Sequence, residues 1–448
     1  MSRERISRRQ LLRTAGVAAA GVGLGGLRPV VAQAAFADPV LDTESMMGVP
    51  YEARDLVRVG LIGCGRRGHS LLNDLLGIEK VEVRAVCDVN PAHAASAQAL
   101  CEKRKARRPE AYTNGERHYE VLVARDDLDL VYIPSPWRWH VPMAVAAMQA
   151  GKHVAVEVPA ALTLADCWKL VEVSERTRRH CTMLENCTYG YEEMLVKRMV
   201  QAGLFGDLLH AECAYDHDLR GIVFENDSEG LWRRAEHIGR NGNLYPTHGL
   251  GPVAGYLGIH KGDRFDYMVS MSSPEAGLSA YRKEKLPAGD PRSLEKYDCG
   301  DVNTSLLKTT QGRTIVLQHA VANPRPYDRI NLIAGTKGIF RGYPARIFFD
   351  GQGDEHKWGS LKPWKARYED PLWTTLKKAA SKSGHGGMDY VMSFRLVDCM
   401  RRGLPPDMDV YDAAAWSAPG PLSEMSVATG SAPVKFPDFS RGRWANAR

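Results

Sequence analysis

The chain has 448 residues, of which 44% are hydrophobic and 25% are charged, and its formal net charge is +6. This is the composition of a globular protein long enough for two domains with separate cores. Most of the positive charge lies in the first 34 residues, so the remainder gives no reason to expect a nucleic acid or an anionic membrane as partner.

The first 34 residues have the parts of a signal peptide. Arginines precede a short apolar run over 15–27, and Ala32-Gln33-Ala34 is a plausible cleavage site. The order "SRRQLL" at 7–12 is typical of a twin-arginine address, which exports folded proteins. An ordinary signal for unfolded chains and a membrane-spanning helix are the alternatives. We predict a twin-arginine signal peptide over 1–34 and a periplasmic or secreted protein with no membrane segment in its mature form.

A polar arm over 35–55 precedes a regular alternation of strands and helices. Residues 57–63 form an apolar run with β-branched residues, as a buried parallel strand requires. A glycine turn and an amphipathic helix follow, and then a second strand, which together have the size of one βαβ unit. Further strands are expected at 128–136, 152–159 and 181–187, and helices at 140–151 and 163–177. The sequence therefore predicts a Rossmann domain with a doubly wound parallel sheet over 56–187.

The first turn of this domain carries a G-x-G-x-x-G motif between strand and helix. Its glycines are Gly63, Gly65 and Gly68. Glycines in this context permit a tight turn and the approach of a pyrophosphate to a helix N-terminus. Asp88 closes the second strand, where a carboxylate accepts hydrogen bonds from ribose hydroxyls and repels a 2′-phosphate, so NAD is favoured over NADP. Arg66 and Arg67 either contact phosphate or point to solvent, and a plain glycine turn with a surface aspartate is the alternative.

The rest of the chain, 188–448, is different in kind. Strand-like segments lacking intervening helices are expected at 208–216, 264–273, 303–310, 314–321 and 330–340. They predict an α+β domain with an open, mostly antiparallel sheet. A long loop is expected at 216–252, where Trp232 argues for order and function. The basic stretch at 102–110 is expected to be a solvated helix face.

Neither a disulfide framework nor a metal site is predicted. The nine cysteines include no C-x-x-C pair and are spread through expected strands. Asp216-His217-Asp218 offers metal-binding groups, but consecutive residues on a strand do not easily converge on one ion.

Several segments resemble known families. The glycine motif, "YIPSPWRWH", "HVAVEVPAAL" and the sheet domain resemble the glucose-fructose oxidoreductase and inositol dehydrogenase superfamily. Within it, "ENCTYGYEE", "LWRR", "RNGNLYPTHGLGP" and "NPRPYDR" are similar to the NAD-dependent family 109 glycoside hydrolases, typified by α-N-acetylgalactosaminidase. The resemblance covers about 55–440, and "NGNLYPTHGLGP" is its most specific part.

The resemblance implies two sets of site residues. NAD is expected to contact Asp88, Trp137, Arg138, Trp139, His140, Glu157, Val158, Asn186 and Tyr245. The sugar is expected to contact Tyr215, Arg233, Tyr245, Pro246, Thr247, His248 and Tyr327. Glu157 is expected to position the nicotinamide or its ribose, and Arg233 to hold sugar hydroxyls or the acetamido oxygen, unless it forms a surface ion pair. Val158 departs from the lysine that oxidoreductase members carry, which puts a plain dehydrogenase in doubt.

An exported enzyme has no soluble NAD pool to draw on, so a redox-neutral reaction with a tightly bound cofactor is expected. Cleavage by oxidation at C3, elimination, water addition and reduction is such a reaction. We expect His248 and Tyr245 to serve the C3 hydroxyl, with Tyr327 or Tyr215 near C2. The alternatives are a histidine satisfied at a helix start and tyrosines that only pack.

The predicted function is thus an exported, NAD-dependent glycosidase acting on a small carbohydrate or glycoconjugate. The resemblance suggests a terminal α-N-acetylgalactosaminide, but the sequence alone fixes neither sugar nor anomer. Two rivals are a periplasmic sugar oxidoreductase with tightly bound cofactor and a noncatalytic sugar-binding protein. A homo-oligomer is compatible with the sequence.

Overall fold

The computed structural model describes residues 38–446, so the predicted signal peptide lies outside the described residues. The first sheet has six parallel strands in the order β3-β2-β1-β4-β5-β6. This order is that of doubly wound dinucleotide-binding folds and confirms the predicted Rossmann sheet. The strand bounds are β1 Val57–Ile62, β2 Val81–Cys87, β3 Glu110–Tyr112, β4 Leu130–Ile133, β5 His153–Val156 and β6 Cys181–Met183.

The helices of this half connect the parallel strands. Their bounds are α2 Arg66–Leu75, α3 Pro91–Lys103, α4 Tyr119–Val123, α5 His140–Gln149 and α6 Leu164–Thr177. Sequence analysis did not predict α3, β3 or α4. The basic side chains of the stretch 102–110 are exposed, but the prediction of a helix face there is wrong, because α3 ends at Lys103 and a loop follows. The start of α3 carried a readable signal, since Asn90 caps it and Pro91 occupies its first turn.

The second sheet has eight strands in the order β13-β12-β11-β7-β10-β9-β8-β14. Only the β7–β10 pair is parallel, which confirms a mostly antiparallel sheet. The bounds are β7 Leu208–Asp216, β8 Phe265–Ser272, β9 Val302–Thr309, β10 Thr314–Ala320, β11 Leu332–Gly335, β12 Gly338–Arg341, β13 Arg346–Phe349 and β14 Val434–Lys435. The segment 330–340, expected as one strand, is the hairpin of β11 and β12.

Helices are numerous in this half, so the expectation that its strands lack them is wrong. They are α7 Tyr191–Gln201, α8 Arg220–Val223, α9 Arg233–Gly239, α10 Thr247–Leu257, α11 Gly277–Lys285, α12 Lys362–Tyr368, α13 Pro371–Ala380, α14 Met388–Arg402, α15 Val410–Ser417 and α16 Pro419–Ala428. The predicted loop at 216–252 contains α8, α9 and the start of α10. A helix buried on nearly all sides, such as α15, shows little amphipathic periodicity, which hid it from sequence analysis.

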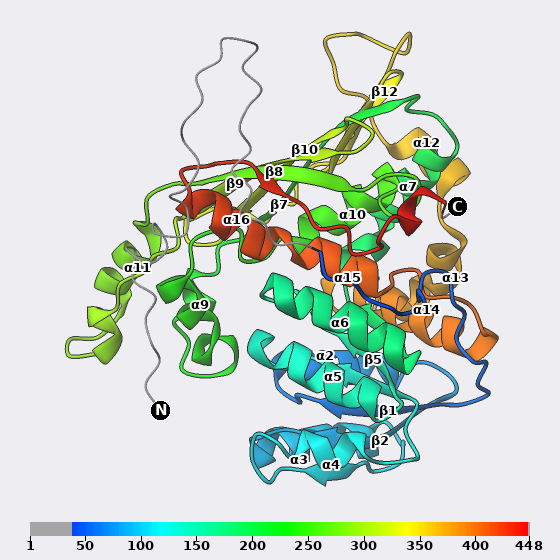
Figure 1. Cartoon of the computed structure of the whole chain (residues 1–448), viewed down its shortest axis with the longest axis vertical. Helices are drawn as coiled ribbons and strands as arrows, with labels where there is room; N and C mark the ends of the chain where they lie inside the picture. Colours follow the sequence, from blue (N-terminus) through cyan, green and yellow to red (C-terminus); the bar gives the residue numbers. More distant parts are fainter. Residues whose placement is uncertain (1–37, 447–448) are drawn as a thin grey trace. The chain divides into compact units, whose positions relative to one another are not determined.

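The C-terminal helices return to the Rossmann sheet. Helix α14 packs against α2, and α15 lies beside α6 (Figure 1). The arm before β1 is held there too, because the Tyr411 hydroxyl accepts a hydrogen bond from the backbone N–H of Met46 at 2.9 Å. The described residues belong to one compact unit. Asp389 of α14 accepts a hydrogen bond from Arg67 at the start of α2. The predicted boundary at 187/188 stays a prediction.

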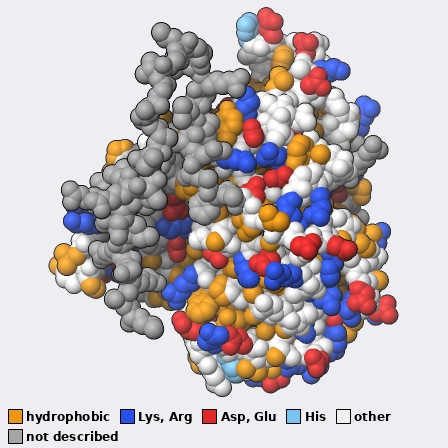
Figure 2. Space-filling model, viewed as in Figure 1, with side chains coloured by type: hydrophobic (Ala, Val, Ile, Leu, Met, Phe, Trp, Pro, Cys, Tyr) orange, Lys and Arg blue, Asp and Glu red, His pale blue; other side chains and the backbone are white. Residues whose placement is uncertain are grey.

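Surface charge, cysteines and helix apolarity complete the description of the fold. On the face shown in Figure 2, basic and acidic side chains are interspersed. All nine cysteines lie in the described part of the chain, each buried and free. Among residues 38–446, no helix combines the length and apolarity needed to cross a membrane.

Candidate active site

The glycine turn after β1 leaves space for a ligand at the N-terminus of α2. Gly63 has a φ of +103°, and a Cβ there would lie 2.9 Å from the Pro134 carbonyl oxygen. A Cβ on Gly68 would clash with the Gly63 carbonyl, so both glycines are required by the backbone. Gly65 differs, because the nearest atom to its Cβ would be 3.9 Å away, on His93. The space beside Gly65 fits a phosphate held by the N–H groups of a helix start.

Asp88 lies directly after β2 and joins two backbone segments. Its Oδ2 accepts a hydrogen bond from the Cys64 N–H at 2.7 Å, and its Oδ1 accepts one from Asn90 N–H at 2.8 Å. Each carboxylate oxygen has a second acceptor position. Asp88 therefore holds the glycine turn in shape and still has acceptors for ribose hydroxyls, which fits NAD.

The two motif arginines have different environments. Arg66 is exposed and pairs with Glu225 at 2.9 Å. The Arg67 side chain points inward, where its Nε donates to Glu157 and its Nη1 to Asp389, both at 2.6 Å. Arg67 thus connects the start of α2 with the end of β5 and the start of α14.

The Asp389 carboxylate accepts hydrogen bonds from several side chains near the start of α2. Its side chain is 0% exposed and accepts hydrogen bonds from Asn186 Nδ2 at 2.7 Å and from His385 Nδ1 at 2.7 Å, besides those from Arg67. Burial alone would raise the pKa of its carboxyl, but His385 and Arg67 hold that pKa well below its usual range. Sequence analysis missed Asp389, because its partners lie up to 322 positions away.

The residues of the "WRWH" segment have different roles: Trp137 packs on a predicted site residue, and His140 fixes backbone loops. Trp137 is buried and stacks on Tyr245 with ring centroids 5.5 Å apart. His140 is fully buried, and its two ring nitrogens each lie 2.8 Å from a backbone carbonyl oxygen, of Pro159 and of Ser135. His140 therefore fixes the loops that follow β4 and β5.

For three other residues predicted to contact NAD, the structure shows surroundings that give no sign of a cofactor contact. Arg138 is exposed and pairs with Glu116 at 3.5 Å. Trp139 packs edge-on against Tyr119. Val158 is 2% exposed, so the position that holds lysine in the oxidoreductases is here a buried aliphatic side chain. Their contacts with NAD stay predictions.

The residues predicted for the sugar converge around one tyrosine. The Tyr215 ring, on β7, lies 4.6 Å from that of Tyr245, 5.3 Å from that of His248 and 6.2 Å from that of Tyr327. Arg233 is buried, pairs with Glu229, and places its guanidinium carbon 5.0 Å from the Tyr245 ring centroid. Pro246 and Thr247 are buried at the start of α10. The structure thus brings this predicted set together.

A buried carboxylate orients His248. Glu185, which is 0% exposed, accepts a hydrogen bond from His248 Nδ1 at 2.8 Å, and His248 Nε2 lies 3.5 Å from the Tyr245 hydroxyl. Although burial alone would raise the pKa of the Glu185 carboxyl, His248 holds it below its usual value. Because Nδ1 donates to Glu185, Nε2 of the neutral ring is free to accept a proton. Sequence analysis named His248 but missed Glu185.

The tyrosines are neutral phenols in the resting site. Burial raises the pKa of Tyr215 to about 12 and that of Tyr245 well above its ordinary value. The Tyr215 hydroxyl lies 3.1 Å from His217 Nδ1, and burial lowers the pKa of His217. Each of the two buried tyrosines therefore has a histidine ring nitrogen beside its hydroxyl. The lowered pKa keeps the His217 ring neutral, so its unprotonated nitrogen is an acceptor.

The aspartates beside His217 do not join it. Asp216 pairs with Arg325 at 2.7 Å and Asp218 with Arg220 at 2.9 Å. Asp216 is the last residue of β7, and His217 and Asp218 follow the strand rather than lying on it. The three side chains have separate partners.

One other group of metal-ligand types exists among the described residues. Glu185, Cys187 and His248 place potential ligand atoms within 4.8 Å of one another. Glu185 and His248 are already hydrogen-bonded, and burial raises the pKa of the Cys187 thiol well above its usual value, which disfavours the thiolate that binds metals. We assign no metal to this group.

Comparisons with known proteins cover nearly the whole described chain. Residues 57–184 match the model of the oxidoreductase family with an NAD-binding Rossmann fold, and residues 189–446 match that of the C-terminal domain of glycosyl hydrolase 109. A glycosyl hydrolase family 109 protein of Solibacter usitatus is 55% identical, with 98% of each chain covered. The α-N-acetylgalactosaminidase of Shewanella oneidensis is 46% identical, covering 99% of this chain and 98% of its own.

Solved structures share the fold at low identity. Levoglucosan dehydrogenase in complex with NADH and levoglucosan has a TM-score of 0.65 at 19% identity, covering 85% of this chain and 100% of its own. An NAD-binding oxidoreductase from Klebsiella pneumoniae has a TM-score of 0.68 at 18% identity, covering 86% and 100%. These likenesses concern the fold alone.

Proposed function

The chain belongs to glycosyl hydrolase family 109, and from that premise we propose that it removes a terminal α-linked N-acetylgalactosamine with NAD that stays bound through every turnover. Family membership confirms the resemblance drawn from the motifs, and with it an NAD-dependent glycoside hydrolase. The choice of sugar is supported by the 46% identity to the Shewanella α-N-acetylgalactosaminidase. The mechanism is supported by one observation above all, the buried chain from Glu185 through His248 to Tyr245.

The residues at the edge of the first sheet would hold the cofactor. The space beside Gly65 would take the pyrophosphate and Asp88 the ribose, while Asn186 and Glu157, fixed by Asp389 and Arg67, would lie toward the nicotinamide. When bound, NAD supplies a reversible hydride acceptor for sugar C3, which makes oxidation, elimination, water addition and reduction redox-neutral.

The chain's own groups move the protons. His248 Nε2 takes the proton of the C3 hydroxyl, directly or through the Tyr245 hydroxyl, and the Glu185 carboxylate stabilises the imidazolium that results. At C2, Tyr215 is favoured over Tyr327 because its hydroxyl lies beside His217, which can accept its proton. The aglycone leaves as its alcohol, and the water that adds its hydroxyl to C1 supplies the balancing proton. The same groups then return the protons of C2 and of the C3 hydroxyl.

The rival sugar oxidoreductase has less support. The lysine that handles the hydroxyl proton in oxidoreductase members of the superfamily is replaced by Val158, an aliphatic side chain buried beside the cofactor edge. A ketone held at C3 instead acidifies the C2 hydrogen, which leads to elimination of the C1 substituent. In the proposed reaction His248, rather than a lysine at position 158, takes the proton of the C3 hydroxyl.

Isotope exchange tests the mechanism. The purified enzyme cleaves an α-N-acetylgalactosaminide in heavy water, and NMR of the released sugar locates deuterium. Elimination requires deuterium at C2, because the base exchanges with solvent, while a substrate deuterated at C3 keeps its label. Cleavage that leaves C2 free of deuterium would overturn the mechanism but not the glycosidase activity. Substrates with good and poor leaving groups should both show the exchange.

We also propose export in the folded, NAD-loaded state. The support is the order of residues 7–12 and the nicotinamide cofactor itself, which is made in the cytoplasm. Replacement of both Arg8 and Arg9 by Lys should retain the enzyme in the cytoplasm, whereas the parent chain should reach the periplasm with NAD bound. Unchanged export of the double variant, or exported protein without cofactor, would contradict this.

A further inference from the structure

The loop that carries Tyr327 crosses the end of β7, the strand that lies between β10 and β11 in the second sheet. The chain leaves β10 at Ala320, which pairs with Asp216 on one side of β7. It returns on the other side, where Asp328 exchanges two backbone hydrogen bonds with the same Asp216, at 3.0 and 2.9 Å. Both ends of the loop 321–327 are therefore attached to the last residue of β7.

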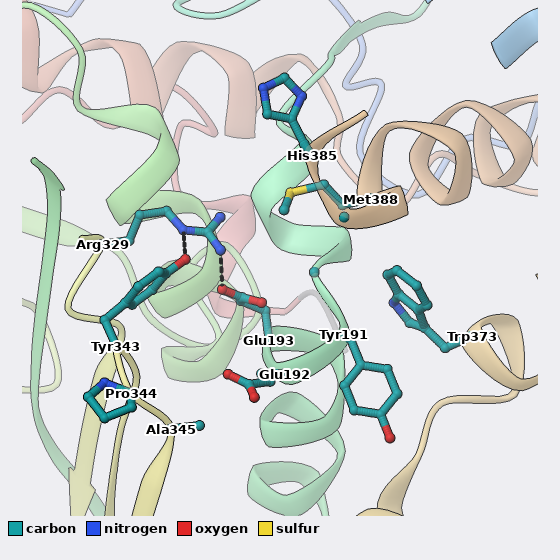
Figure 3. Close-up of a pocket in the computed structure, with 12 residues that line it drawn as sticks. Tyr191, Glu192, Glu193, Arg329, Tyr343, Pro344, Ala345, Trp373, His385 and Met388 are labelled. Carbon is teal, nitrogen blue, oxygen red and sulfur yellow. Dashed lines mark hydrogen bonds and ion pairs between the residues drawn. The ribbon is translucent and has the colours of Figure 1, made fainter. Parts of the chain in front are cut away.

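The chain that follows the loop is fixed by side chains. Arg329 donates from Nε to the Tyr343 hydroxyl and from Nη2 to Glu193, both at 2.6 Å, as the dashed lines in Figure 3 show. Its carbonyl oxygen accepts a hydrogen bond from the backbone N–H of Ala214 on β7 at 2.9 Å. These contacts hold the returning chain, but they lie beyond the loop itself.

Within the loop, one side chain makes an attachment of its own. Arg325 Nη2 lies 2.7 Å from Oδ2 of Asp216, whose side chain is 1% exposed. Among residues 38–446, no other cation pairs with Asp216, and no other side chain of 321–327 makes a hydrogen bond or an ion pair. Burial raises the pKa of the Asp216 carboxyl to about 6, although Arg325 opposes the rise. At neutral pH the pair is therefore charged on both sides.

Tyr327 is held less firmly by packing than the other tyrosines of the site. It is 40% exposed, whereas Tyr215 is 6% and Tyr245 is 8% exposed. Its ring lies edge-on to that of His217 at 5.0 Å and to that of Tyr215 at 6.2 Å. A side chain that buries less apolar surface gains less from packing, so the position of Tyr327 depends more on the conformation of its loop.

We propose that Asp216 is a positioning residue for Tyr327: its ion pair with Arg325 holds the loop 321–327 over the end of β7 and keeps the tyrosine where it contacts the sugar. Consecutive strand residues point to opposite faces, so the Asp216 side chain points away from that of Tyr215 and does not touch the sugar itself. A loop fixed in its binding conformation before the sugar arrives avoids the cost of ordering it. The inference rests on the proposed function and concerns sugar binding rather than the chemical step.

Neutralising the ion pair tests this role in the NAD-loaded enzyme. Asp216→Asn keeps the shape of the side chain but removes its charge. The Kd for N-acetylgalactosamine, measured by calorimetry, and the KM for an α-N-acetylgalactosaminide should both rise roughly 2- to 10-fold, as for one more side chain to be ordered on binding. The kcat, the NAD content and the circular dichroism should change little. Arg325→Gln should act in the same way, and Arg325→Lys, which keeps the charge, should have a smaller effect.

A double variant separates positioning from a general structural role. Tyr327→Ala removes the sugar contact, so adding Asp216→Asn to it should raise the Kd no further if Asp216 acts through Tyr327. Asp218→Asn is the matched control, because Asp218 also pairs with an arginine, Arg220 at 2.9 Å, which lies outside the loop. This control should leave both the Kd and the KM unchanged.

The outcomes that would overturn the positioning role are distinct from a failure of the proposed function. An unchanged Kd in Asp216→Asn and Arg325→Gln, or an effect of Asp216→Asn that persists in the Tyr327→Ala background, would overturn it. So would a Tyr327→Ala variant that binds the sugar as the parent does. If Asp216→Asn does not fold, Arg325→Gln decides, since its side chain is 29% exposed. An unaltered enzyme that cleaves no α-N-acetylgalactosaminide would contradict the proposed function itself.

Discussion

Replacing Glu185 by Gln tests the proton path most directly, because this carboxylate touches His248 but not the expected sugar. Its two oxygens lie 2.8 and 3.0 Å from His248 Nδ1, and its side chain is fully buried. Gln keeps the shape but loses the charge that stabilises the imidazolium. A hydrogen bond to a charged group contributes about 1.5–3 kcal/mol, so kcat should fall roughly 10- to 150-fold.

The assay is the steady-state hydrolysis of an α-N-acetylgalactosaminide at a fixed pH, with NAD content and circular dichroism measured on the same samples. KM and NAD content should change little, since Glu185 orients a group rather than binding substrate. Glu175→Gln is the matched control, because that carboxylate is also buried and hydrogen-bonded, to Tyr411 and Arg441. The reasoning is refuted if Glu185→Gln lowers kcat no more than Glu175→Gln does, or only in proportion to lost NAD.

Three further variants test the cofactor edge and its support. Asp88→Ala should lose NAD during purification, because charge-assisted hydrogen bonds to ribose contribute about 1.5–3 kcal/mol each; full release of nicotinamide on denaturation would contradict the placement. Asp389→Asn removes one of the two carboxylates that pair with Arg67. It should lower the free energy of unfolding, measured in urea, by about 3–5 kcal/mol. An unchanged midpoint of urea unfolding would oppose this. Burial raises the pKa of Asp74 to about 6, so the folded state keeps a proton that the unfolded chain releases. The free energy of unfolding should therefore fall as the pH rises from about 4 to 6. Asp74→Asn should remove up to about 3 kcal/mol of that decline. An equal decline in this variant would show that Asp74 does not cause it.

The Rossmann sheet was predictable because its central strands are buried on both faces. The runs at β1, β4 and β5 are therefore apolar except for Arg58 and His153, and they stand out from their surroundings. The edge strand β3 has only three residues, one of them exposed, and carries no such signal. Helix α3 is rich in alanine and has little amphipathic character, so only its capping residues announced it.

The site was predictable where its residues are close in sequence. The glycine turn and Asp88 lie within one βαβ unit, and the segment 245–248 leads into α10, which begins at Thr247. Glu185 and Asp389 lacked that advantage, since their partners lie 63 and up to 322 positions away. A buried carboxylate is recognised by what it contacts, and those contacts exist only after the two halves of the chain have packed.

The carboxylates around the proposed site also bear on how a glycoside is cleaved there. Hydrolysis by direct displacement needs one carboxyl group with a raised pKa to protonate the leaving group and a second carboxylate across the bond. Here Glu157 pairs with Arg67, Glu229 with Arg233, and Glu185 with His248. The pKa of Glu185 is lowered rather than raised, which is the wrong direction for a general acid. The groups left to move protons are histidines and neutral phenols, and these suit activation through a ketone at C3, where the aglycone leaves without being protonated by a carboxylic acid.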